Sequence, residues 1–363
     1  MKLSLNRSEF AEAVKSCQSV IAARTPKPIL QCVLLETCDD RLVLSASDLE
    51  IGLRCTVDQV EIEEPGKIVI PADKLSQIVS ESADELLRIE AQDNICHIRG
   101  QDSHFQIFTR DVADFTPVVA EGDDDFELKV GELKPLSDWT VFAAARENTR
   151  YAINGVLWEK DAGKLTLVAT DGRRLARAAR SVNGGGKPRR GIVPIKAMHV
   201  ISRVLTDPAG TVGVAITANQ ILLHTAKAAF SSALLEGHFP NYEEVIPSDC
   251  DKKAEFETAE LLSAVRRASL LSNDESKGVK LSFTQGKLTL SSRTPEQGEA
   301  VVEVPVEYTQ GDVSIGFNPA FLTDVLRVTH EDRIVFEFKE PNRPGLFRGG
   351  EGFLYVVMPV NLT

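Results

Sequence analysis

The stretch Lys164-Leu165-Thr166-Leu167 decides the fold, because the chain repeats it on both sides at a fixed step. Arg41-Leu42-Val43-Leu44 precedes it and Lys287-Leu288-Thr289-Leu290 follows it, each 123 residues away. An aspartate follows the first two copies, as Asp48 and Asp171. A long fixed step with weak identity indicates one folding unit used three times. We therefore expect three similar domains, and a function that belongs to their assembly.

Each copy carries the same order of predicted elements. A short strand leads into a helix, a hairpin follows, then an apolar strand, a proline and a second helix, and strands close the copy. Asn6-Arg7-Ser8-Glu9 resembles a capping box before the first helix, and Thr258 is the expected N-cap in the third copy. Short connections between strands favour an α+β fold with mainly antiparallel sheets. We place the domains at 1–122, 123–250 and 251–363.

The composition is typical of a soluble globular protein, with 363 residues of which 43% are apolar and 26% charged. No run approaches the length of a membrane span, and the opening MKLSLNRSEF lacks the long apolar stretch of a signal peptide. The six cysteines form no CxxC pair and do not recur with the domains. This argues against a disulfide framework, so we expect a protein of the reducing cytoplasm.

The charge of the chain is unevenly distributed. A net charge of −12 and a pI near 5.1 are unusual for a protein that binds nucleic acid. Acidic runs such as Glu121–Asp125 look like linkers or outer surface, whereas cations recur on or near the two expected helices of each copy. These cations are Lys15, Arg24, Lys27 and Lys74, then Lys134, Arg146, Arg150, Lys196 and Arg203, then Arg266, Arg267 and Arg327. Solvated helix faces have the same pattern, but its repetition favours a functional cluster.

The sequence contains no familiar catalytic or metal-binding motif. Walker, HExxH, GxSxG and EF-hand patterns are absent, and the six histidines fit no metal-ligand spacing. The basic run Gly184–Arg190 lacks the hydroxyl residue of a phosphate-binding loop. Thr170–Leu175 predicts a turn with an arginine pair just past it, and the corresponding turn of the first copy has no cationic pair. Either this turn carries a site in one copy only, or its arginines are merely solvated. We expect no catalysis, no cofactor and no metal.

The whole chain resembles the bacterial DNA polymerase III β subunits, the replication sliding clamps. The segments that carry the resemblance occur in the right order and are Arg150–Gly155, Ala169–Ala176, Phe239–Tyr242, Leu271–Asn273, Gly316–Asn318 and Tyr355–Val360. The resemblance implies three clamp-type domains, with antiparallel sheets outside and helices lining a central hole. It also implies that two chains join head to tail in a closed ring. An acidic exterior and a basic bore would then reconcile the net charge with DNA binding.

The implied function is that of a non-catalytic processivity factor that encircles duplex DNA without sequence specificity. The implied partners are double-stranded DNA, the DNA polymerase III catalytic subunit, the clamp-loader complex, other polymerases and repair proteins with clamp-binding peptides, and a second copy, with no membrane. Two alternatives stay open. One is an enzyme with a cleft between repeats, and the other is a clamp paralogue that serves repair or drug tolerance.

The resemblance implies three sets of site residues. The partner-peptide pocket, between the second and third domains, comprises Ile153, Thr170, Gly172, Arg174, Leu175, Pro240, Val245, Asn318, Phe321, Val356, Met358 and Pro359. The DNA-binding set is Arg24, Lys74, Arg146, Arg150, Lys196 and Arg203. The dimer-interface set is Lys74, Phe105, Ile107, Leu270, Leu271, Glu296 and Glu299. The chain departs from the family at Ser276, where a large side chain can contribute to the pocket, and at Glu244, a position that can be arginine.

Overall fold

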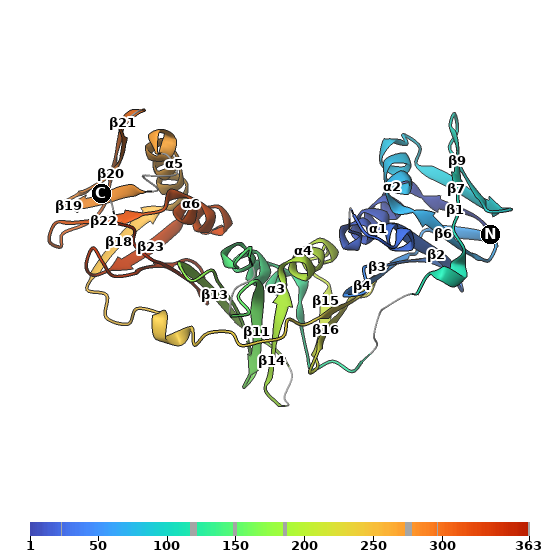
Figure 1. Cartoon of the computed structure of the whole chain (residues 1–363), viewed down its shortest axis with the longest axis horizontal. Coiled ribbons are helices and arrows are strands. Elements are labelled where there is room, and N and C mark those ends of the chain that lie inside the picture. The colour runs from blue at the N-terminus through green and yellow to red at the C-terminus, as the bar shows by residue number, and fades with distance from the viewer. Residues whose placement is uncertain are drawn as a thin grey trace. The chain divides into compact units, whose positions relative to one another are not determined.

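The computed structural model in Figure 1 describes residues 1–22, 24–116, 122–147, 151–183, 187–272, 278–295 and 297–361. The chain forms two compact units. Unit 1 comprises Met1–Lys134 and Val182–Leu235, and unit 2 comprises Pro135–Ser181 and Glu236–Thr363. The expected second domain, 123–250, therefore contributes residues to both units.

Unit 1 contains two sheets. The first has the order β5-β1-β7-β8-β9 and consists of β1 (Lys2–Asn6), β5 (Val60–Glu64), β7 (Leu86–Gln92), β8 (Ile95–Arg99) and β9 (His104–Phe108). The second has the order β10-β15-β16-β17-β4-β3-β2-β6 and consists of β2 (Cys32–Cys38), β3 (Arg41–Ser47), β4 (Ile51–Val57), β6 (Lys67–Pro71), β10 (Phe126–Lys129), β15 (Thr211–Ile216), β16 (Gln220–His224) and β17 (Ala228–Ala233). In it β4 of the first copy pairs with β17 of the second, and Leu53 lies opposite Phe230.

Unit 2 repeats this arrangement one copy further along. One sheet has the order β21-β20-β19-β22 and consists of β19 (Val279–Thr284), β20 (Lys287–Thr294), β21 (Gly298–Pro305) and β22 (Val313–Phe317). The other runs β11-β12-β13-β25-β24-β23-β18 and consists of β11 (Gly155–Asp161), β12 (Lys164–Thr170), β13 (Arg174–Ser181), β18 (Lys252–Glu257), β23 (Arg333–Phe338), β24 (Gly345–Arg348) and β25 (Phe353–Val357). Here β13 of the second copy pairs with β25 of the third.

The remaining elements include one further strand, β14 (Arg189–Pro194), in unit 1. The helices in the described residues are α1 (Arg7–Val20), α2 (Ala72–Glu81), α3 (Val130–Asp138), α4 (Ile195–Val204), α5 (Thr258–Ala268) and α6 (Pro319–Val328). Short 3-10 turns are η1 (Pro28–Gln31), η2 (Val112–Asp114), η3 (Val141–Ala143), η4 (Glu243–Val245) and η5 (Ser269–Leu271). The described pairings are antiparallel, which confirms the predicted α+β fold with antiparallel sheets.

The helices form adjacent pairs that pack on the sheets. In unit 1, α1 lies beside α2 and packs on β3 and β4, while α5 lies beside α6 in unit 2 (Figure 1). The Asn6 side chain accepts a hydrogen bond from the Glu9 backbone N–H at 3.1 Å, which confirms the predicted cap. The reciprocal bond of a capping box is replaced, because the Glu9 carboxylate accepts from the Gln59 N–H at 2.9 Å and the Asn6 N–H donates to the Gln59 carbonyl at 3.0 Å. The predicted Thr258 cap is wrong. Helix α5 begins at Thr258 itself, because its buried hydroxyl donates to the Glu331 carbonyl at 2.7 Å instead of capping the helix.

Two glycines with positive φ form a matched test of how tightly unit 2 packs. Gly352 has a φ of +82°, and a Cβ there would lie 2.2 Å from the Ala179 carbonyl oxygen. Gly286 has a φ of +76° and open space around its Cβ position. We expect Gly286→Ala to lower the free energy of unfolding by about 1 kcal/mol, through backbone strain alone. Gly352→Ala adds a steric clash, so its loss should exceed that of Gly286→Ala by about 1–3 kcal/mol in urea unfolding. Equal losses would contradict this packing.

Candidate functional site

The turn between β12 and β13 is built by its own side chains. The Thr170 hydroxyl donates to the Arg174 carbonyl at 2.6 Å and accepts from the Gly172 N–H at 3.1 Å. One carboxylate oxygen of Asp171 accepts from the backbone N–H groups of Arg173 and Arg174 at 2.9 and 3.0 Å. Gly172, with a φ of +82°, has nothing within 4 Å of its Cβ position. The turn is therefore rigid, and the space above Gly172 is open to a ligand.

Arg174 holds this turn in place rather than facing solvent. Its guanidinium donates to Asp171 at 3.0 Å, to Asp324 of α6 at 2.6 Å and to the Phe142 carbonyl at 2.9 Å. It also lies over the Phe321 ring, 4.5 Å from the centroid, and its side chain is only 10% exposed. Burial alone would lower the pKa of Arg174, but Tyr355 and the two carboxylates raise it overall. The charge is thus permanent and already paired, so Arg174 shapes the site.

The last strand and the tail lie against the same turn. In the pairing of β13 with β25, Leu175 lies opposite Val356. Beyond the strand, the Met358 N–H donates to the Arg173 carbonyl at 2.9 Å, and the Val360 N–H donates to the Gly316 carbonyl at 2.8 Å. Val356 is buried, whereas Met358 is 41% exposed. Bonds between backbone groups therefore present the Met358 side chain beside the turn.

Other predicted pocket residues are held by local bonds in unit 2. Val245 is 49% exposed and lines one cavity of about 280 Å³ together with Met358. Asn318 caps α6 by accepting from the Ala320 N–H at 2.9 Å. Ile153 is buried and its carbonyl accepts from the Ala145 N–H at 2.9 Å, while Pro240 and Pro359 are partly buried. Ser276 lies outside the described residues.

The predicted DNA-binding cations differ in their surroundings. Arg24, Lys74 and Arg203 of unit 1 and Arg146 of unit 2 are exposed. Lys196 is instead bound within unit 1, where its ammonium donates to the Val20 carbonyl at 2.6 Å and pairs with Asp48. Arg150 lies outside the described residues. Within unit 1, Lys196 and Arg203 line one groove between α1 and α4.

The predicted interface residues lie on or near two strands that end their sheets. Phe105 and Ile107 belong to β9, at the end of the five-stranded sheet. Glu299 belongs to β21, at the end of the four-stranded sheet, and η5 carries Leu270, which is 75% exposed, and Leu271. Lys74 is exposed on α2 and donates to Gln77 at 3.3 Å. Glu296 lies outside the described residues.

The sequence analysis did not select two exposed apolar residues on these same strands. Phe108 on β9 is 76% exposed, and Val301 on β21 is also exposed. The sequence signal that could have found Phe108 is the alternation of side chains between the two faces of a strand. If Phe105 and Ile107 face the core side, Phe108 must face the other side.

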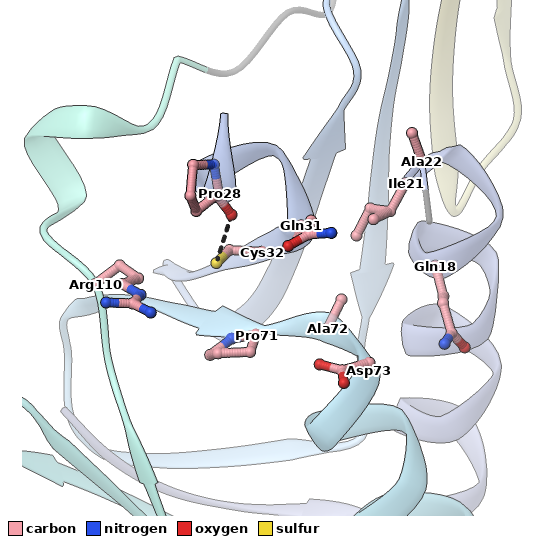
Figure 2. Close-up of a pocket in the computed structure, with 10 residues that line it drawn as sticks. All are labelled: Gln18, Ile21, Ala22, Pro28, Gln31, Cys32, Pro71, Ala72, Asp73 and Arg110. Atoms are coloured by element: carbon pink, nitrogen blue, oxygen red, sulfur yellow. Dashed lines mark hydrogen bonds between the residues drawn. The ribbon is translucent and has the colours of Figure 1, made fainter. Parts of the chain in front are cut away.

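A separate cavity of about 440 Å³ lies where the end of α1, η1 and the start of α2 meet (Figure 2). The Cys32 thiol inside it donates to the Pro28 carbonyl at 3.7 Å. None of the predicted site residues lines this cavity. No cluster of His, Cys, Asp or Glu side chains in the described part of the chain could hold a metal ion. Nor does any helix described there have the length and apolar character to cross a membrane.

Comparison with known proteins covers the whole chain. Family models of the DNA polymerase III beta subunit match as its N-terminal domain at residues 1–119, its central domain at 127–241 and its C-terminal domain at 243–361. The chain belongs to the DNA polymerase III beta subunit family. As a family member it is a DNA sliding clamp, a processivity factor rather than an enzyme.

Individual relatives are similar to this chain over their full lengths. The beta sliding clamps of Pseudomonas aeruginosa and Escherichia coli K12 are 34% and 30% identical, with complete coverage of both chains. The crystal structure of the Pseudomonas aeruginosa subunit bound to griselimycin matches with a TM-score of 0.92 at 34% identity, and the Bacillus subtilis sliding clamp with 0.90 at 28%. Both matches cover all of this chain and all of the solved chain.

Arg174 should prove to be a structural residue of the clamp. Arg174→Lys removes the forked geometry that reaches two carboxylates and a carbonyl, so we expect unfolding in urea to require about 2–3 kcal/mol less free energy. The neighbouring Arg173 is exposed, so Arg173→Lys is the matched control and should change stability by less than about 0.5 kcal/mol. If the two substitutions had the same effect, the assigned role of Arg174 would be refuted.

Proposed function

We propose that two copies of this clamp join head to tail around duplex DNA and hold partner proteins through a peptide pocket in unit 2. We also propose the domain boundaries 1–122, 123–250 and 251–363, and a cytoplasmic location. The observation that carries the proposal is the pattern of strand pairing. Strand β4 of copy one pairs with β17 of copy two, and β13 of copy two pairs with β25 of copy three.

The repeat identifies the strands that form the joint. Within their copies, β4, β13 and β21 each follow the hairpin that comes after the first helix, and β9, β17 and β25 each close a copy. Two of these strands, β21 and β9, end their sheets. An unpaired edge presents a row of free N–H and C=O groups, which favours addition of a further strand. The same pairing can therefore form between two chains, with the β21 edge of one chain against the β9 edge of the other.

The side chains on both edges suit such a joint. Phe105 and Ile107 on β9 and the buried Val302 and Val304 on β21 would continue one apolar layer from copy to copy. The exposed Leu270 of η5 adds apolar surface. Lys74 of one copy and Glu296 and Glu299 of the other supply opposite charges at the rim. An apolar centre with a charged rim is typical of a stable interface.

The dimer is tested by one exposed leucine. Leu270→Lys places a charge in the proposed apolar centre, so the dissociation constant of the dimer should rise at least about 30-fold, or about 2 kcal/mol. Sedimentation velocity should then give the 39.7 kDa monomer where the parent is a dimer. Leu86 is also an exposed leucine, on β7, and Leu86→Lys should leave the mass unchanged. A Leu270→Lys protein that keeps the mass of a dimer would rule out this joint.

DNA is held by the cations of the proposed bore, Arg24, Lys74, Arg146, Arg150, Lys196 and Arg203. Contacts to phosphate hold the duplex without reading its sequence. Topological linkage lets these contacts stay weak enough for sliding. The proposed DNA partner agrees with the exposure of Arg24, Lys74, Arg146 and Arg203 on a chain whose net charge is −12.

The peptide pocket is proposed to comprise the turn at Thr170–Leu175, Ile153, Pro240, Val245, Asn318, Phe321 and the tail from Val356 to Pro359. Support comes from the open space over Gly172 and from Met358, which is exposed beside a buried strand. An apolar wall with a few polar groups suits a short peptide with aliphatic or aromatic anchors and a glutamine. We propose that this peptide belongs to the polymerase III catalytic subunit, the clamp loader, and other polymerases and repair proteins.

The pocket is tested by shortening the tail. Truncation after Val357 removes Met358 and Pro359, and the affinity for a fluorescent peptide of this kind should fall at least about 30-fold, because buried anchors dominate such contacts. Met358→Ala keeps the backbone bond to Arg173 and should also weaken binding. Truncation after Asn361 is the control. Unchanged affinity after loss of Met358, in a protein that still has the mass of a dimer, would move the pocket elsewhere.

A clamp paralogue that serves repair or drug tolerance is the remaining alternative. Stimulation of the replicative polymerase of the same organism, in the presence of its clamp loader, separates the two roles.

A further inference from the structure

The cavity of about 280 Å³ in unit 2 continues the proposed peptide pocket on one side of Met358. One of its walls is the segment 244–250, which begins in η4 and leads towards β18. The other wall consists of Lys339, Arg343 and Pro344, which lie between β23 and β24. Because Val245 and Met358 belong both to this cavity and to the proposed pocket, a peptide anchored there can extend between the two walls.

The carboxylate near the far end of the first wall, that of Asp249, is already paired. It accepts a hydrogen bond from the Lys339 ammonium at 2.8 Å, and this bond holds the pKa of Asp249 below its ordinary value. The positive charge of Arg343 lowers the pKa of the same carboxylate further. Asp249 is therefore offset by cations of the opposite wall, and it has little charge left to attract a ligand.

The other carboxylate of this wall, that of Glu244, has no such cation. It accepts a hydrogen bond from the Asn241 side-chain amide at 2.7 Å, which is a neutral donor, and none of the residues that the structure describes forms an ion pair with it. A carboxylate can accept further hydrogen bonds beside this one. Glu244 is exposed and directly precedes Val245, whose side chain is 49% exposed. An uncompensated negative charge therefore lies next to the apolar wall of the proposed pocket.

A carboxylate beside an apolar wall favours lysine or arginine in a bound peptide. Their apolar stems can cover Val245 while the charged head donates to Glu244. A glutamate in the same place would meet a like charge, which opposes binding. We propose that Glu244 is a specificity-determining residue of the peptide pocket and selects partner peptides with a lysine or arginine directly beside their anchors. This inference rests on the proposed function and names the charge of the peptide.

Fluorescent peptides measure this preference in the full-length protein. Each peptide has a glutamine and aliphatic anchors, with lysine, alanine or glutamate placed directly before or directly after the anchors. At one of the two positions the lysine peptide should bind about fivefold more tightly than the glutamate peptide at 0.1 M salt, and this ratio should fall towards one as salt is added. Glu244→Gln should reduce the ratio to about one, and Glu244→Lys should invert it. Glu243→Gln is the matched control, because Glu243 is the neighbouring exposed carboxylate and does not line the cavity.

The possible outcomes are distinct, because each ratio is measured within one protein. Equal affinities for the lysine and glutamate peptides at both positions, in a parent that binds the alanine peptide, would overturn the role of Glu244 and leave the pocket in place. A ratio that survives Glu244→Gln would assign the selection to another charge. A ratio that falls as much in Glu243→Gln as in Glu244→Gln would reflect only the net charge of η4, and the specific role of Glu244 would be lost. If the parent does not bind the alanine peptide, the proposed pocket itself fails.

Discussion

Backbone hydrogen bonding along strand edges is the constraint on which the rest of this structure depends. A sheet edge that ends in solvent exposes polar groups that favour pairing with another strand. The copies of the repeat satisfy this need for one another, through β4 with β17 and β13 with β25. The series leaves β9 at one end and β21 at the other. The same physical requirement that joins the copies within a chain therefore favours head-to-tail joining of two chains.

A cation accompanies each of these strand pairings. Next to β4 and β17, Lys196 of α4 binds the Val20 carbonyl and Asp48 of the turn. Next to β13 and β25, Arg174 of the corresponding turn binds the Phe142 carbonyl and Asp324 of α6. The turn after β3 supplies the carboxylate of Asp48 to its ion pair, whereas the turn after β12 supplies the guanidinium of Arg174. Only the second turn has glycine, Gly172, at the position that Leu49 occupies with a φ of +81°. The open space over Gly172 is the reason why we propose the peptide pocket at this turn rather than at the turn of the first copy.

Features encoded locally could be read from the sequence, and those that depend on distant partners could not. The step of 123 residues predicted three copies, and the short connections between strands predicted antiparallel sheets. The spacing of Asn6 and Glu9 predicted a cap, because both residues lie at the start of one helix. Lys196 was assigned to the DNA-binding set without its ion pair, since its partner Asp48 is 148 residues away in the chain. Thr258 failed as a cap for the same reason, because the Glu331 carbonyl competes for its hydroxyl. The sequence likewise did not reveal that Arg174 is already paired.

The central claim is that the two remaining strand edges close a ring around DNA. It is tested most directly by cysteines at Gln106 and Glu299, bridged by a flexible bis-maleimide in a Cys38→Ser, Cys250→Ser background after the clamp loader has placed the protein on circular plasmid. Both positions are exposed, on β9 and β21. The account predicts a covalently closed pair of chains that stays on circular DNA in denaturing detergent and leaves once the DNA is linearised. Cross-linked protein that detergent strips from circular and linear DNA alike would contradict it.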